Sequence, residues 1–138
     1  MTLSIAGRCA ETGMLGGAVT SSSICVTSRC LFTRAGVGAA LTQNVTDPSL
    51  GEKMLNCLES GENVKTAVSK VVSEENHIQW RQLVLLDSTG NSALHTGEKV
   101  LGKHAMFQGN QCAAAANLLA NKSVPSAMVE AFEKSSGH

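Results

Sequence analysis

The feature that most constrains the fold is an apolar stripe at residues 64–72, where valine or alanine recurs at helical spacing. The stripe comprises Val64, Ala67, Val68, Val71 and Val72. This spacing of i, i+3, i+4, i+7 and i+8 predicts a helix with one continuous apolar face, which must lie on an equally apolar surface. An aliphatic run at residues 82–86 follows and is typical of a buried strand. The chain therefore needs a sheet with a helix packed on it.

Signals before the stripe add strands and a further helix. Residues 3–7 and 16–20 indicate an amino-terminal hairpin, and a Gly- and Ala-rich run at 37–43 indicates a third strand. Asp47 with Pro48 marks the start of a helix. Its apolar face would comprise Leu50, Met54, Leu55 and Leu58. The first half of the chain is thus predicted to be three strands followed by two helices.

The second half repeats this order of strands and then helices. Residues 92–96 and 105–108 are predicted strands, the first of them paired with 82–86 across a turn. Residues 112–120 favour a helix by their Ala and Leu content, and Ser123 marks the start of the last helix. The apolar face of that helix comprises Val124, Ala127, Met128, Ala131 and Phe132. We therefore predict a single α+β domain over residues 1–138, with helices covering mainly antiparallel sheets.

Charge and cysteine usage exclude several classes of function. Eleven Lys and Arg balance eleven Asp and Glu without a basic cluster, so nucleic-acid binding by counter-ion release has no source. No apolar run approaches the about 20 residues that a membrane-spanning helix needs. The five cysteines form an odd, irregularly spaced set, which indicates reduced and mostly buried thiols. We expect a cytoplasmic protein without nucleic-acid or membrane partners.

Recognisable motifs for metals and cofactors are also missing from the sequence. Segment 97–104 is close to the phosphate-binding pattern G-x-x-x-x-G-K, but His104 stands where that loop needs Ser or Thr. A hairpin loop with surface lysines is the favoured interpretation of this segment. The four histidines show no metal-binding spacing. We predict neither a metal site nor a cofactor.

The amino terminus offers the one candidate for catalysis. Thr2 follows the initiator methionine and opens the first predicted strand. If Met1 is removed, a threonine hydroxyl can attack an acyl carbon with its own α-amine as the base, because the unperturbed pKa of that amine lies near about 8. A retained Met1 would block this amine. Threonine is also common at position two, so its presence alone is a weak indication.

A set of short segments resembles a known family, DUF1028, which is grouped with the N-terminal nucleophile hydrolases. The segments are 1–8 (MTLSIAGR), 12–13 (TG), 16–21 (GGAVTS), 34–39 (RAGVGA), 42–43 (TQ), 47–48 (DP), Gly51, 81–82 (RQ), Asp87, 96–97 (TG) and 108–110 (QGN). They occur in the family's order from Met1 to about Phe132. The resemblance implies a four-layer αββα sandwich. It also implies a further helix and strands beyond residue 138, so we expect an open sheet edge and self-association.

The resemblance places Thr2 at the centre of the site as nucleophile. Arg34 would then steady a carboxylate or lower the pKa of the amine, and Gln108 or Asn110 would donate to an oxyanion. Residues expected to bind substrate are Thr20, Ser21, Ser22, Thr42 and Gln43. The alternative for Arg34 is a structural role in the loop before the third strand. The alternative for Gln108 and Asn110 is an amide-stabilised turn.

The low charge of the chain bears on the substrate class. With 16% charged residues, a small neutral amide, imide or ureide fits better than a nucleotide or polyanion. The function expected from the sequence is hydrolysis of such a bond by an N-terminal nucleophile. The alternative is an inactive domain of the same fold that binds a small ligand or serves as one protomer of a homo-oligomer.

Overall fold

The computed structural model describes residues 1–136 and contains two antiparallel four-stranded sheets. The first sheet has the order β2-β1-β8-β7, with β1 (Thr2–Arg8), β2 (Leu15–Ser21), β7 (Ala105–Gly109) and β8 (Cys112–Asn117). The second sheet has the order β3-β4-β5-β6, with β3 (Leu31–Arg34), β4 (Gly38–Asn44), β5 (Arg81–Asp87) and β6 (Ser92–Thr96). The helices are α1 (Thr27–Cys30), α2 (Ser49–Glu59), α3 (Val64–Glu74), the 3-10 turn η1 (Ile78–Trp80) and α4 (Val124–Glu133).

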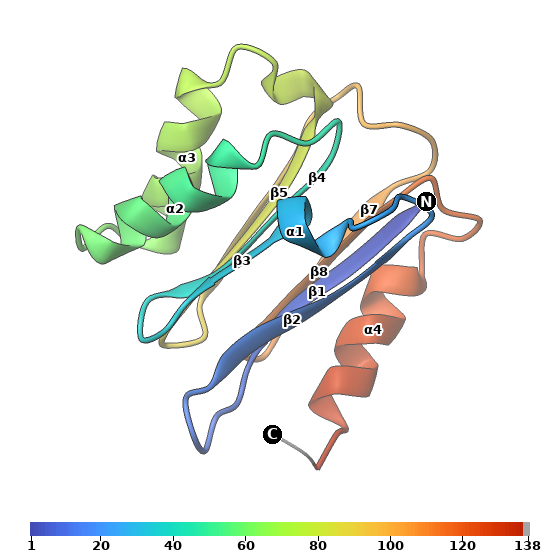
Figure 1. The fold of residues 1–138 in the computed structure, drawn as a ribbon. Helices are drawn as coiled ribbons and strands as arrows, with labels where there is room; N and C mark the ends of the chain where they lie inside the picture. The colour runs from blue at the N-terminus through green and yellow to red at the C-terminus, as the bar shows by residue number, and fades with distance from the viewer. Residues whose placement is uncertain (137–138) are drawn as a thin grey trace.

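The elements stack in layers, with the two sheets face to face and helices on the outside of each (Figure 1). Helices α2 and α3 cover the second sheet, and the predicted stripe of α3 is buried there with Leu83 and Leu85 of β5. Helix α4 covers the first sheet, where Val129 packs on Ala114. The α+β class and the two helix-covered antiparallel sheets expected from the sequence are therefore confirmed.

The core between the sheets is built from small side chains on one sheet and large ones on the other. Strands β1 and β8 contribute Ala6, Ala113 and Ala115, and β4 and β5 contribute larger residues. The larger ones are Leu41, Val84 and Leu86, and β4 also contributes the small Ala39. Such pairing of small with large side chains lets two pleated surfaces approach and fill the space between them.

The alanine-rich run at 112–120 is where the sequence prediction was wrong. It forms strand β8 and the loop after it, paired on both sides with β1 and β7. Alanine favours helices in isolation, but here a small side chain is needed on both faces, because one face meets the other sheet and the other face meets α4. Tertiary packing has overridden the local propensity. The sequence also did not indicate β3 or the short α1.

Helix α4 approaches the first sheet closely at a glycine. A Cβ atom at Gly7 would overlap the ring of Phe132, so this position admits no side chain without displacing the helix. Helix α4 contacts β7, β8 and β1, whereas Ala18 on the neighbouring β2 stays exposed. The outer face of the first sheet is therefore only partly covered.

Candidate functional site

Thr2 begins β1 on the face that points between the sheets. Side chains alternate along a strand, and Ser4 and Ala6, which share the face of Thr2, are buried between the sheets. The Thr2 Oγ1 atom lies 3.0 Å from the Oγ of Ser21, its cross-strand partner on β2. The Ser21 hydroxyl also donates to the carbonyl of Met1 at 3.0 Å. Ser21 therefore links the hydroxyl of Thr2 to the peptide bond that precedes it.

A buried network of uncharged polar groups continues from Thr2 into the space between the sheets. The Ser4 hydroxyl donates to Gln43 Oε1 at 2.5 Å, and Gln43 Nε2 donates to Gln82 Oε1 at 2.7 Å. Asn117 Nδ2 donates to the same Gln82 oxygen at 3.3 Å, and Gln82 Nε2 donates to the Ala116 carbonyl at 3.2 Å. All these side chains are at most 2% exposed. The network joins β1 and β8 of one sheet to β4 and β5 of the other.

Asn117 is the amide that the strand register brings beside Thr2. The two residues are Cα partners in the antiparallel pair of β1 and β8, and cross-strand partners in such a pair point to the same face. One hydrogen of the Asn117 amide is used by Gln82. The second hydrogen is a donor at the level of the Thr2 hydroxyl.

Of the expected substrate-binding residues, the structure brings Ser21 and Gln43 to this site and not the other three. Thr20 is exposed and, one residue along β2, points to the opposite face from Ser21. Ser22 is exposed in the bend after β2. Thr42 lies on the face of β4 that meets α2, where its Oγ1 contacts Thr46 Oγ1 at 3.0 Å and donates to the Asp47 carbonyl at 3.3 Å.

Arg34 lies away from Thr2 and has a structural environment. It ends β3, and its guanidinium donates to Glu52 and to Glu59 of α2 at 2.7 Å each. It also donates to Asn56 on the same helix at 2.9 Å. These contacts tie β3 to α2 on the outside of the second sheet. The structural interpretation of Arg34 therefore replaces the catalytic one.

Gln108 and Asn110 lie at the opposite end of the first sheet from Thr2. Gln108 is level with Ala113, which in turn pairs with Ala6. Ala6 lies four positions along β1 from Thr2, which puts Gln108 at least about 13 Å from Thr2. The Gln108 amide donates to the Ser92 carbonyl at 2.8 Å. Asn110 lies still farther along, in the β7–β8 turn, so neither amide can reach an oxyanion at Thr2.

Three residues of the network escaped the sequence analysis, namely Ser4, Gln82 and Asn117. Ser4 had a signal, because it lies two residues from Thr2 in a strand and shares its face. Gln82 was included in a predicted strand and in the family segment 81–82, but not as a site residue. Asn117 was hidden by the incorrect helix over 112–120.

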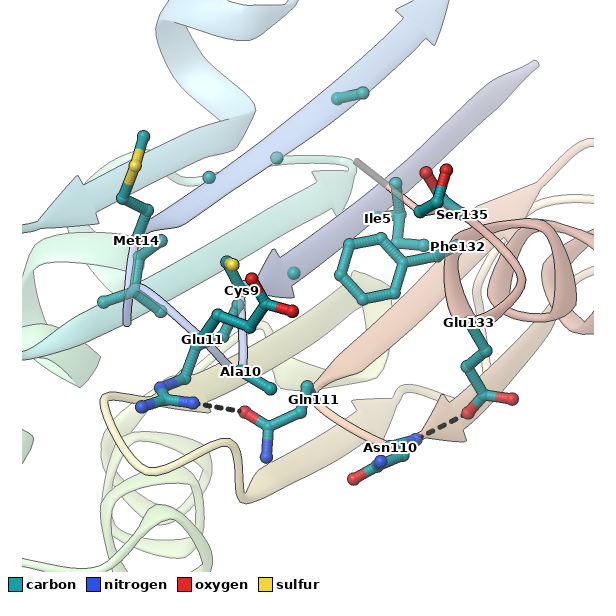
Figure 2. Close-up of a pocket in the computed structure, with 17 residues that line it drawn as sticks. Ile5, Cys9, Ala10, Glu11, Met14, Asn110, Gln111, Phe132, Glu133 and Ser135 are labelled. Atoms are coloured by element: carbon teal, nitrogen blue, oxygen red, sulfur yellow. Dashed lines mark hydrogen bonds between the residues drawn. The ribbon is translucent and has the colours of Figure 1, made fainter. Parts of the chain in front are cut away.

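A groove lies on the other face of the first sheet (Figure 2). It measures about 840 Å³ and runs between the β1–β2 turn, the outer face of β2 and the end of α4. Arg8 donates to Gln111 Oε1 at 2.8 Å, and the Asn110 backbone donates to Glu133 at 2.7 Å. Hydrogen bonds from Thr12 lower the pKa of the Cys9 thiol at its edge. The first sheet separates this groove from the Thr2 hydroxyl.

Among the described residues, no three His, Cys, Asp or Glu side chains are grouped so as to hold a metal ion. Within residues 1–136, no helix has the length and apolar character that crossing a membrane requires. The candidate site consists of the Thr2 hydroxyl beside a network of neutral amides and hydroxyls. Such groups can orient and polarise a carbonyl substrate.

Comparison with known proteins gives a family and similar solved structures. The model of a family of unknown function, DUF1028, matches residues 2–138. The crystal structure of a DUF1028 protein from Silicibacter pomeroyi matches with a TM-score of 0.95 and 32% sequence identity over 99% of this chain. The match covers 61% of that protein's chain, so this chain spans less than two thirds of its relative's length. A search of curated proteins found no match.

Proposed function

This chain belongs to DUF1028, a family of unknown function, and we propose that it is an N-terminal nucleophile hydrolase of amide bonds with Thr2 as its nucleophile. The observation that carries the proposal is the hydrogen bond of 3.0 Å between Thr2 Oγ1 and Ser21 Oγ, at the head of a strand whose inner face leads into the buried amide network. We also propose that the two helix-covered sheets form the αββα sandwich of that superfamily.

The reaction begins with removal of Met1, whose side chain is 50% exposed. Removal frees the α-amine of Thr2, and the Ser21 hydroxyl loses the carbonyl to which it now donates. Thr2 Oγ1 attacks the substrate carbonyl carbon and transfers its proton to this amine. The amine then protonates the leaving nitrogen as the C–N bond breaks. Water hydrolyses the resulting ester, returning the hydroxyl to Thr2 and releasing the acid.

Asn117 takes the oxyanion role that the sequence analysis gave to Gln108 or Asn110. The Asn117 side chain lies on the same face of the first sheet as Thr2, and Gln82 Oε1 holds its amide by accepting one of the two hydrogens. A donor held in place before the reaction stabilises negative charge as it develops. Ser21 is a positioning residue for the nucleophile.

The neutral character of the network supports the substrate class expected from composition. Ser4, Gln43, Gln82 and Asn117 are buried without a charged side chain among them. A charged substrate group placed there would lose its hydration without gaining an ionic partner. A small neutral amide, imide or ureide is therefore the proposed substrate.

Intact mass and hydrolysis of a panel of neutral anilides and ureides test this proposal. In protein shown to lack Met1, Thr2→Ala abolishes turnover at an unchanged melting temperature, and Thr2→Ser retains part of it. Thr20→Ala, one residue along β2 from Ser21 and on the opposite face, is the matched control and keeps full activity. Asn117→Ala, checked for folding by circular dichroism, lowers kcat by about 100- to 1000-fold. Turnover by Thr2→Ala equal to that of the parent would refute Thr2 as the nucleophile, and no turnover by the parent on any substrate of the panel would favour the ligand-binding alternative.

The proposal also includes a cytoplasmic location and self-association. The five cysteines are free thiols, which fits a reducing, cytoplasmic location. Strand β2 is a seven-residue edge strand without a charged residue, the kind of edge that pairs with another chain. Light scattering of the purified protein tests self-association, and a stable monomer would contradict it.

A further inference from the structure

Three exposed aliphatic side chains lie on the loops at the Thr2 end of the sheets. They are Val45 after β4, Leu101 between β6 and β7, and Leu118 after β8, exposed by 46%, 44% and 47% respectively. Single exposed apolar residues are ordinary in soluble proteins. These three differ because their loops are joined to one another. We call them the aliphatic rim.

One backbone–backbone hydrogen bond and one bond from the backbone to a side chain hold the rim loops together. The Leu118 backbone donates to the Leu101 carbonyl at 3.2 Å, and the Leu101 backbone donates to Asn44 Oδ1 at 3.1 Å. Figure 1 shows the loop between β6 and β7 turning beside the end of the chain marked N. Leu118 has φ +52° and Asn44 has φ +79°, in the left-handed region. Leucine rarely adopts this region, so the fold holds Leu118 there against its preference.

The strand register places the rim next to the nucleophile. Thr2 is the Cα partner of Asn117, and Leu118 is the following residue. Cross-strand and sequential Cα spacings together put the Leu118 Cα about 6 Å from that of Thr2. Leu118 is therefore the rim residue whose backbone lies next to Thr2, and its side chain lies against Gly102 of the β6–β7 loop.

The two lysines of the β6–β7 loop that flank Leu101 have other partners. Lys103 Nζ donates to the Ala120 carbonyl at 3.2 Å. The ammonium of Lys99 lies 5.6 Å from the centre of the Trp80 ring, a cation–π contact. These contacts draw both charges to neighbouring groups, which suits the rim to an uncharged alkyl group.

We propose that the aliphatic rim binds the alkyl chain of the substrate's acyl group, so that the enzyme prefers neutral amides of unbranched aliphatic acids. The inference rests on the proposed function and names its substrate class. An alkyl chain is favoured over a second copy of the protein as occupant, because the rim continues directly from the nucleophile. Burial of each methylene on the rim raises kcat/KM by about fourfold.

The experiment compares acetyl, butyryl and hexanoyl p-nitroanilides with protein that lacks Met1. The parent hydrolyses the butyryl substrate about 15-fold faster than the acetyl one in kcat/KM, since the two acyl groups differ by two methylenes. Leu118→Asn removes this preference while keeping the left-handed backbone, which asparagine adopts readily. Leu101→Gln weakens it. Met14→Gln, at a residue 60% exposed in the β1–β2 turn, is the control and keeps the preference.

Binding separates this inference from the proposed function. Calorimetry with Thr2→Ala protein measures acetamide against hexanamide, and we expect hexanamide to bind at least about tenfold more tightly. Length-dependent binding without hydrolysis of any anilide would refute the proposed function and leave the rim as an alkyl-binding surface. Equal kcat/KM for all chain lengths, or a preference that survives in Leu118→Asn, would overturn the inference. A dimer that Leu118→Asn dissociates would also overturn it, since a second copy would then occupy the rim.

Discussion

Replacing Gln82 by methionine tests whether the buried amide network holds the two sheets together. Gln82 is fully buried, and its Oε1 is the common acceptor for Gln43 Nε2 at 2.7 Å and Asn117 Nδ2 at 3.3 Å. Methionine has a similar volume, so the substitution removes the hydrogen bonds without leaving a large cavity. Its main effect is to leave two buried amides without an acceptor.

The size of the effect follows from those two donors. A buried donor left without a partner costs about 1–3 kcal/mol, so the loss of an acceptor for two donors lowers the free energy of unfolding of Gln82→Met by about 2–6 kcal/mol. Domains of this kind have a total of roughly 5–15 kcal/mol. The melting temperature should fall by roughly 10–20 °C.

Urea unfolding followed by circular dichroism measures the loss, with Gln108→Met as the matched control. Gln108 is also a strand glutamine that donates to a carbonyl, but it is exposed. Water can replace its hydrogen bonds, so the control loses less than about 1 kcal/mol. Similar losses in both variants, with unchanged denaturant slopes, would show that the network does not stabilise the packing of the sheets as argued.

Three further predictions concern ionisable groups. Glu75 pairs with Arg81 at 3.1 Å, and both side chains are 10% exposed, so Glu75→Gln lowers the free energy of unfolding in urea by about 3 kcal/mol. Glu130→Gln, at the exposed pair with Lys134, lowers it by less than about 0.5 kcal/mol. Equal losses in the two variants would contradict this prediction. Although burial opposes ionisation of Asp87, hydrogen bonds within its own turn outweigh it and hold its pKa below 3.8. Its stabilisation is therefore present above that pH and lost as pH falls through the lower folded value, so the urea midpoint of Asp87→Asn falls less on acidification than that of the parent. Burial raises the pKa of Cys112 to about 11, so an aromatic disulfide reagent at pH 8 does not modify this thiol until urea unfolds the chain. Peptide mass mapping that finds fast labelling of Cys112 in the native protein would refute this prediction.

The sequence by itself determined the elements whose side-chain pattern is periodic. The stripe on α3 and the hairpin of β1 and β2 were predicted from spacing alone, because helical and strand periodicities are local properties. Thr2 itself was singled out by its position after Met1, where a hydroxyl and an α-amine can act together. These inferences need no knowledge of what packs on the element.

Only the tertiary structure decided which residues accompany Thr2. Asn117 and Gln82 lie far from Thr2 in the sequence and meet it through the register of β8 on β1 and the packing of the two sheets. Gln108 resembled an oxyanion donor in its local motif, yet the antiparallel pairing carries it to the other end of the sheet. Whether Ala113 and its neighbours form a helix or a strand also depends on two surfaces that meet them from outside. Local propensity is worth less than about 1 kcal/mol for each residue, and burial between two layers outweighs it because each face of β8 removes apolar area from water along its whole length.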